Sequence, residues 1–290
     1  MIQTFRRSWM LVKASAEVLR KDPELLALPL ISGGALIAII IVFALPLFGS
    51  GLLQNIATRN TITLGQILTT LFVVILFYIV TYVIVVFSNA ALVGAALIRL
   101  EGGNPRLEDG LKVARERFRS ILGYGLMAGS VGMVMRFLKE ERSTGIGSGV
   151  QAVLGGTAWG VATTLVIPIL VTEKLNPIEA LKRSVSLLRK AWGHNLQTRL
   201  SISAAFGIIA LALAVFPGLP MIVIIFGARS GILTVLGATL LLLIYGALAI
   251  LAGALSAVFQ AALYRYATTG EVAKGFTKED FSGAFGEGQE

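Results

Sequence analysis

The chain has 290 residues, of which 56% are hydrophobic and 14% are charged, and its mean hydropathy is +0.82. A soluble domain has about 25% charged residues, so this composition indicates an integral membrane protein. The net charge is +9 and there is no cysteine. The lack of cysteine excludes disulfides, thiolate catalysis and cysteine-ligated metal sites.

Long stretches without Lys, Arg, Asp or Glu predict the membrane spans. Five such windows lie between residues 25 and 264, and each can hold one helix of roughly 20 apolar residues. A shorter run at 120–135 becomes long enough if Arg136 extends to the interface. We therefore expect an all-α membrane bundle of six spans, at about 26–48, 70–97, 119–138, 150–172, 199–226 and 232–264.

The positive charges divide unequally between the two sides of this bundle. Twenty of the 25 Lys and Arg lie before residue 25, at 99–119, at 173–199 or after 264, and five lie in the alternate loops. Cytoplasmic loops are enriched in Lys and Arg. We therefore expect a multi-pass protein of the plasma (inner) membrane with both termini in the cytoplasm. The first apolar run is a full span and does not have the pattern of a cleaved signal peptide.

Residues 177–192 predict a basic amphipathic helix that lies on the cytoplasmic membrane surface. Asn176 is a candidate N-cap, and Pro177 suits the first helical turn. At about 100° per residue, the cations share one face, and the other face carries Ile178, Leu181, Val185, Leu188 and Trp192. The alternative is a soluble loop helix that packs on its neighbours.

One short pattern occurs in three such helices, at 12–20, 111–119 and 181–189. It consists of an apolar residue, Lys, any residue and a small residue, and four positions later an apolar residue followed by Arg. Each copy precedes two predicted spans, so we expect three parallel repeat units within one membrane domain. The units are about 5–98, 104–172 and 176–266, the domain is 1–269, and 270–290 is a cytoplasmic tail that either docks or stays disordered.

Small residues and prolines predict local features of the spans. Glycines spaced by four residues occur at 125–129 and 156–160, so we expect the third and fourth spans to pack closely against each other. Pro168 is expected to kink or break the fourth span. Pro217 and Pro220 are expected to kink or end the fifth.

Catalysis and metal binding have little support in this sequence. No acidic or basic residue lies at the centre of a predicted span, no Ser stands beside a base, and the single histidine, His194, lacks clustered carboxylates. We therefore expect no enzymatic activity, no catalytic residue, no cofactor and no metal site. Nucleic acid is not an expected partner, because the positive charge lies next to the membrane, where lipid phosphates are the nearest anions.

Several stretches resemble a known group of proteins. Residues 177–184, PIEALKRS, follow VIPILV at 166–171 and precede Leu188-Arg189, while RSW stands at 7–9 and DPEL at 22–25. They resemble a group of uncharacterised bacterial and archaeal six-span membrane proteins, which implies no known activity. In its repeat pattern alone, the chain also resembles the membrane domain associated with glycerophosphodiester phosphodiesterases, which implies lipid association.

Two functional hypotheses follow from these patterns. In the first, a non-enzymatic membrane protein binds anionic lipid headgroups on the cytoplasmic side and organises lipid or a membrane-protein partner, with homo-oligomers expected. Its headgroup-binding residues would be Lys13, Arg20, Lys112, Arg119, Lys182 and Arg189. The alternative is a channel or facilitator for small neutral or weakly charged solutes, with a cavity lined by Asn89, Gln260, Thr163 and Tyr82. Hydrogen bonds between helices are the simpler explanation for these four polar side chains.

Overall fold

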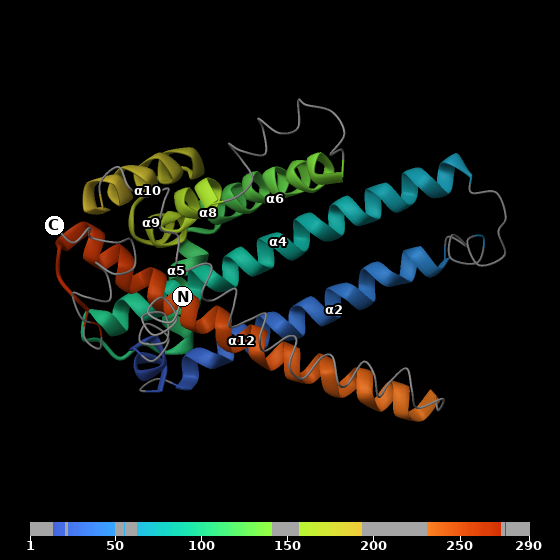
Figure 1. Cartoon of the computed structure of the whole chain (residues 1–290), viewed down its shortest axis with the longest axis horizontal. Coiled ribbons are helices and arrows are strands. Elements are labelled where there is room, and N and C mark those ends of the chain that lie inside the picture. Colours follow the sequence, from blue (N-terminus) through green and yellow to red (C-terminus); the bar gives the residue numbers. More distant parts are fainter. Residues whose placement is uncertain are drawn as a thin grey trace.

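The computed structural model describes residues 14–20, 23–49, 55, 63–140, 157–192, 231–273 and 276. These residues form helices and contain no strand, as the expected all-α class requires. Three long helices, α2 (Ala27–Gly49), α4 (Leu64–Leu100) and α12 (Gly231–Thr269), extend from one end of the molecule (Figure 1), and the shorter helices gather at that end.

Three helices in the described part of the chain are long and apolar enough to cross a membrane. They are Glu24–Pro46, Leu64–Leu100 and Ile250–Thr269, and they fall on the predicted first, second and sixth spans. Helix α6 (Phe118–Glu140) coincides with the predicted third span. The predicted fifth span, 199–226, lies outside the described residues, so the number of six spans stays a prediction.

The outer surface of the long helices is apolar. Leu30, Ile41 and Leu45 of α2 and Leu64 and Phe72 of α4 are all more than half exposed. Soluble monomers rarely expose apolar surface over such a continuous length. In a membrane, lipid tails would cover this surface, so no apolar side chain would be exposed to water. The apolar surface therefore agrees with a membrane protein.

The C-terminal third of α4 is the centre of the core. Residues 90–97 are buried, whereas much of 64–85 is exposed or half-buried. The helices α2, α5, α6, α9 and α12 all pack against α4. A helix of 37 residues is about 55 Å long, and the hydrocarbon core of a bilayer is only about 30 Å thick. The last turns of α4 are therefore covered by protein.

Helix α5 (Leu107–Glu116) crosses α4 through small residues. A Cβ atom at Gly110 would lie 2.5 Å from the carbonyl oxygen of Ala91, and one at Gly94 would lie 2.9 Å from the Val113 side chain. Ala114, one turn after Gly110, is fully buried. The two helices approach this closely because glycine has no side chain at either crossing point.

Helix α6 packs against α4 through two of its glycines. A Cβ atom at Gly125 would lie 3.3 Å from the Val83 side chain, and one at Gly129 would lie 3.7 Å from the Tyr82 ring, whereas one at Gly160 would meet nothing within 4 Å. The prediction that the third and fourth spans pack through these glycines is wrong for the described residues. The glycines of α6 instead make room for the bulky side chains on the neighbouring turns of α4.

The described part of the predicted fourth span, 150–172, is two helices and not one. Helices α8 (Thr157–Thr163) and α9 (Val166–Thr172) are separated by a turn at 164–165. Pro168 causes the break, because it has no N–H for the Thr164 carbonyl and its ring would clash with that carbonyl. The expected effect of Pro168 is thus confirmed. Residues 166–171 are all buried, so α9 lies inside the core.

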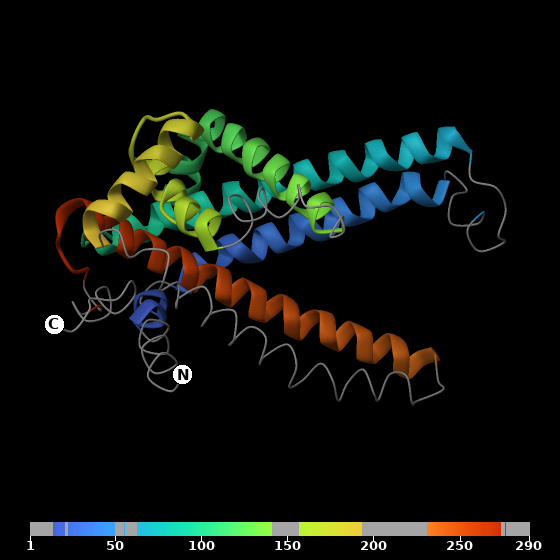
Figure 2. The ribbon, with the colours of Figure 1, turned by 45° about the horizontal axis from the view of Figure 1, so that its top comes forward.

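Helix α10 (Pro177–Trp192) follows α9 and packs on it. Figure 2 shows α10 running obliquely to the long axis of α4, at the end where the short helices gather. Helix α12 ends here as well. Ala273 and Phe276 of the predicted tail are buried, so these two residues are docked.

The close contact of α5 with α4 can be tested by Gly110→Ala. The new methyl group would overlap a backbone carbonyl that no side-chain rotation can move away. Overpacking of this kind costs about 1–3 kcal/mol, against about 1 kcal/mol gained from helix propensity. We expect a lower Tm for the purified protein in detergent. Gly253→Ala is the matched control, since its Cβ meets nothing within 4 Å and its Tm should be equal or higher. An unchanged Tm for Gly110→Ala would show that the helices do not approach this closely.

Candidate functional site

Positive charges gather at one end of the bundle, which we call the basic end. The described residues of α2, of α4 up to residue 98 and of α12 up to residue 264 contain no Lys or Arg. The cations that define the basic end lie on or beside the short helices and at the ends of α4 and α12: Arg20, Arg99, Arg106, Lys112, Arg115, Arg117, Arg119, Lys174, Lys182, Arg183, Arg189, Lys190 and Arg265.

The three copies of the sequence pattern share one burial pattern. The small residue of each copy, Ser15, Ala114 or Ser184, is fully buried. The Lys and Arg of the copies are exposed wherever the structure describes them, at Arg20, Lys112, Arg119, Lys182 and Arg189. Lys13 lies outside the described residues. Each helix therefore packs through its small residue and turns its cations outward.

The start of α10 matches the sequence prediction. The Asn176 side-chain oxygen accepts a hydrogen bond from the Glu179 N–H at 2.9 Å, and the Glu179 carboxylate accepts one from the Asn176 N–H at 3.2 Å. This reciprocal pair is a capping box. Asn176 is thus the N-cap of α10, and Pro177 is its first residue.

The buried face of α10 combines small and large residues. Ala180, Ser184, Leu187 and Leu188 are buried, whereas Ile178 is 59% exposed. The predicted apolar face is therefore divided, with Leu188 buried in the bundle and Ile178 exposed. Small side chains at 180 and 184 let α10 approach α9 closely, so they define the contact more strongly than the largest apolar residues do. Ile178 is left on the exposed surface one turn before Lys182, a combination that suits the boundary between headgroups and lipid tails.

Ser184 also has a polar role in the core. Its hydroxyl accepts a hydrogen bond from the Leu165 N–H at 3.3 Å, at the turn that Pro168 creates between α8 and α9. This N–H is buried and would otherwise lack a partner at the helix start. The equivalent hydroxyl of the first copy, on Ser15, has no hydrogen-bond partner among the described residues.

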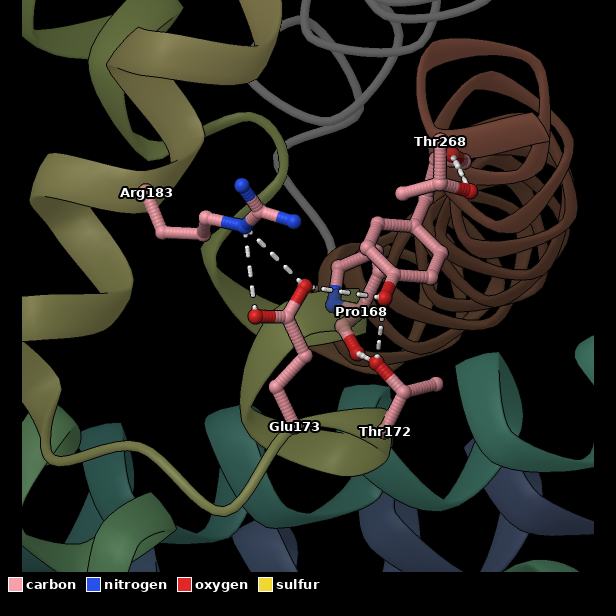
Figure 3. Close-up of polar contacts among 6 residues, drawn as sticks. Pro168, Thr172, Glu173, Arg183 and Thr268 are labelled. Carbon is pink, nitrogen blue, oxygen red and sulfur yellow. Dashed lines mark hydrogen bonds and ion pairs between the residues drawn. The ribbon is translucent and has the colours of Figure 1, made fainter. Parts of the chain in front are cut away.

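A polar cluster around Glu173 ties α9, α10 and α12 together (Figure 3). The Glu173 carboxylate pairs with the Arg183 guanidinium of α10 at 3.2 Å and accepts a hydrogen bond from the Tyr264 hydroxyl of α12 at 3.1 Å. The Thr172 hydroxyl lies 2.8 Å from both the Tyr264 hydroxyl and the Pro168 carbonyl. The sequence analysis missed this cluster, because nothing in the order of residues relates Glu173 to a tyrosine 91 positions later.

Arg265 makes a second set of polar contacts between helices at the basic end. Its guanidinium donates to the carbonyl of Leu100, the last residue of α4, and pairs with Glu271 at 3.1 Å. The last carbonyls of a helix have no partner within the helix, and a cation there is also favoured by the helix dipole. Arg265 therefore fixes the inner end of α4 to α12.

A basic cavity of about 640 Å³ opens beside the junction of α5 and α6. Four cations line it: Arg115, Arg117, Arg119 and, from the loop before α10, Lys174. Glu116 is the one carboxylate in the lining. No ion pair or hydrogen bond joins the four cationic side chains to other residues in the part of the chain that the structure describes. The cavity thus has a positive charge excess and suits an anionic group such as a phosphate.

Two of the four residues proposed for a solute pathway face another helix, because the Tyr124 side chain of α6 is hydrogen-bonded to Thr163 and lies near Tyr82. Gln260 donates to the Ser256 hydroxyl of its own helix at 3.2 Å, and Thr163 donates to the Trp159 carbonyl of its own helix at 2.8 Å. Tyr82 is half-buried beside the Tyr78 ring, and Asn89 is half-buried on α4. The basic cavity and an apolar cavity between α2 and α4 are both lined by other residues.

A family model covers most of the chain. Residues 68–276 match the model of a family described as "Family of unknown function (DUF6159)". The chain belongs to the DUF6159 family. This membership agrees with the resemblance to an uncharacterised family and does not bear on the likeness to the phosphodiesterase-associated membrane domain. The DUF6159 region contains α5, α6, α8, α9, α10 and α12, and so nearly all of the basic end. No curated protein matches the chain.

The equivalent serines of the first and third copies should differ in their effect on stability. Ser184→Ala would leave the buried Leu165 N–H without a partner, at a cost of about 1–3 kcal/mol. Ser15→Ala removes a hydroxyl that has no described partner, so it is the matched control and should be close to neutral. Thermal unfolding in detergent would compare the two. Equal Tm values for both variants would contradict the role assigned to Ser184.

Proposed function

We propose that this protein is a non-enzymatic integral membrane protein that binds anionic lipid headgroups through the basic end and organises lipid or a membrane partner. The observation that carries the proposal is the shared burial pattern of the three copies. Each small residue is buried and each described Lys and Arg of the pattern is exposed. Packing alone does not require cations at these exposed positions, and all those that the structure describes lie at the basic end.

The energetics of the basic end support a lipid surface as the partner. Each Lys or Arg near an anionic membrane contributes roughly 1 kcal/mol, and salt screens this attraction. The attraction of each cation is weak, but the many cations on several helices together give a substantial free energy of membrane binding. Exposed apolar residues beside the cations, such as Ile178 and Phe118, can enter the boundary between headgroups and tails.

In this proposal the basic end faces the cytoplasm of the plasma membrane. The excess of Lys and Arg at this end supports that orientation through the positive-inside rule. The six spans, the three parallel repeat units and the cytoplasmic termini belong to the same proposal. Helix α6 leads away from the basic end, and α10 lies at it (Figure 1). Helices α8 and α9 precede α10 and contact it.

The proposal can be tested by neutralising the six cations of the pattern together. The change of Lys13, Arg20, Lys112, Arg119, Lys182 and Arg189 to Gln should lower the enrichment of phosphatidylglycerol over phosphatidylcholine around the protein at least tenfold, because six attractive charges are lost. The measurement is native mass spectrometry of lipids retained from nanodiscs that contain the two lipids in equal amounts.

The control for this experiment exchanges Lys and Arg for each other at the same six positions. This variant keeps the charge and should keep the enrichment. If the Gln variant retained phosphatidylglycerol as the parent protein does, at the same Tm, the proposed function would be wrong.

A further inference from the structure

An apolar cavity of about 560 Å³ lies between α2 and α4, next to the basic end. Ala35 and Ile31 of α2 form one wall, and Ser88 and Phe87 of α4 form the other. Ile31 is 56% exposed, so the cavity borders the apolar outer surface of the bundle. Its volume is within the range of about 300–1,000 Å³ that is usual for sites of small ligands.

The apolar cavity and the basic cavity meet at two shared residues. Arg115 and Phe118 line both of them. The Phe118 ring packs edge-on against the Phe87 ring, with 6.0 Å between the ring centroids, and so closes the inner end of the apolar wall. Arg115 stands at the boundary with no described ion-pair partner. The apolar cavity thus lies directly beside the group of cations.

We infer that the two cavities together form a discrete site for one anionic phospholipid. An acyl chain occupies the space between α2 and α4, and the phosphate lies among Arg115, Arg117, Arg119 and Lys174. Glu116, on the same rim, faces the more polar part of the headgroup. This inference rests on the proposed function, but it adds a defined stoichiometric site to the general attraction of the basic end.

The pairing of the two cavities favours a membrane lipid over other anions. A free phosphate would use the cations and leave the apolar cavity empty. A polypeptide partner would need an apolar segment at the depth of the lipid tails. A phospholipid carries an apolar chain and an anionic group at adjacent positions, which is the order in which the cavities occur. The cations of Arg115 and Arg119 can each give a phosphate two hydrogen bonds in a fork-like geometry.

The test uses the full chain in detergent, titrated with phosphatidylglycerol and followed by native mass spectrometry. Ala35→Trp fills the apolar cavity without any change of charge and should weaken the tightest-bound phosphatidylglycerol at least tenfold. Ser88→Trp fills the same cavity from the opposite wall. It keeps the test valid if Ala35→Trp does not fold. Val74→Trp, on an exposed part of α4 outside both cavities, is the matched control and should bind as the parent protein does.

Two further measurements separate the parts of the site. Arg115→Gln should also weaken the tightest-bound phosphatidylglycerol at least tenfold, and phosphatidylcholine should bind the parent protein more weakly than phosphatidylglycerol does. Glycerol phosphate, which has no chains, should bind at least a hundredfold more weakly. Unchanged binding in both Trp variants, or glycerol phosphate binding as tight as that of the lipid, would overturn the site.

The site and the proposed function can fail separately. Neutralisation of Lys112, Lys182 and Arg189, which line neither cavity, should reduce the general enrichment of anionic lipid and leave the one tight lipid in place. If the charge variants lose enrichment while the Trp variants bind normally, the proposed function stands and the discrete site is refuted. If the Trp variants lose the tight lipid while the charge variants keep full enrichment, the site stands and the general attraction is refuted.

Discussion

The length of α4 is the constraint on which the rest of the structure depends. At about 55 Å, its 37 residues exceed the hydrocarbon thickness of about 30 Å, and its last turns are still apolar. Those turns have to be buried by protein wherever they leave the lipid. The short helices α5 and α9, together with α12, perform this burial, and the small residues of α4 from 90 to 96 allow them to approach. Helices that cover such an end are apolar inside and polar outside, but this burial does not determine the sign of the charge on the polar side.

Several polar contacts at the basic end give a hydrogen-bond partner to a backbone N–H or C=O group that has none within its own helix. Pro168 breaks the fourth predicted span, and the buried Ser184 hydroxyl accepts the Leu165 N–H that becomes free at the break. The Arg265 guanidinium donates a hydrogen bond to the Leu100 carbonyl at the end of α4. Glu173 links α10 to α12 through Arg183 and Tyr264. Two of these contacts give a backbone N–H or carbonyl its partner, and the Glu173 contacts hold the helices together through side chains. The cations that are left exposed are therefore available for external anions.

Much of this architecture could be predicted from the sequence. Charge-free windows located α2, α4, α6 and α12, because apolar length is the dominant signal in membrane proteins. The N-cap at Asn176 and the break at Pro168 followed from local chemistry that needs no tertiary information. The exposure of the patterned cations also agrees with the predicted amphipathic helices.

Other features depend on which surfaces meet. The helix that packs against Gly125 and Gly129 was predicted wrongly. Two glycines four residues apart identify a contact face but not the helix that it contacts. In α10, Leu188 is buried and Ile178 is exposed, although both lie on the predicted apolar face. The Glu173 cluster and the two cavities join residues from distant parts of the chain. No pattern within a single helix could have indicated them.

The central claim is that the patterned helices share one surface on the cytoplasmic side, and thiol labelling tests it most directly. Since the chain has no cysteine, single cysteines at positions 112, 182 and 189 can be labelled with a membrane-impermeant maleimide in sealed vesicles of known orientation. A cysteine in place of Arg59, in a loop predicted for the opposite side, is the reference. The account predicts that the first three react only in inside-out vesicles and the reference only in right-side-out vesicles. Labelling of position 112 and position 182 from opposite sides would contradict it.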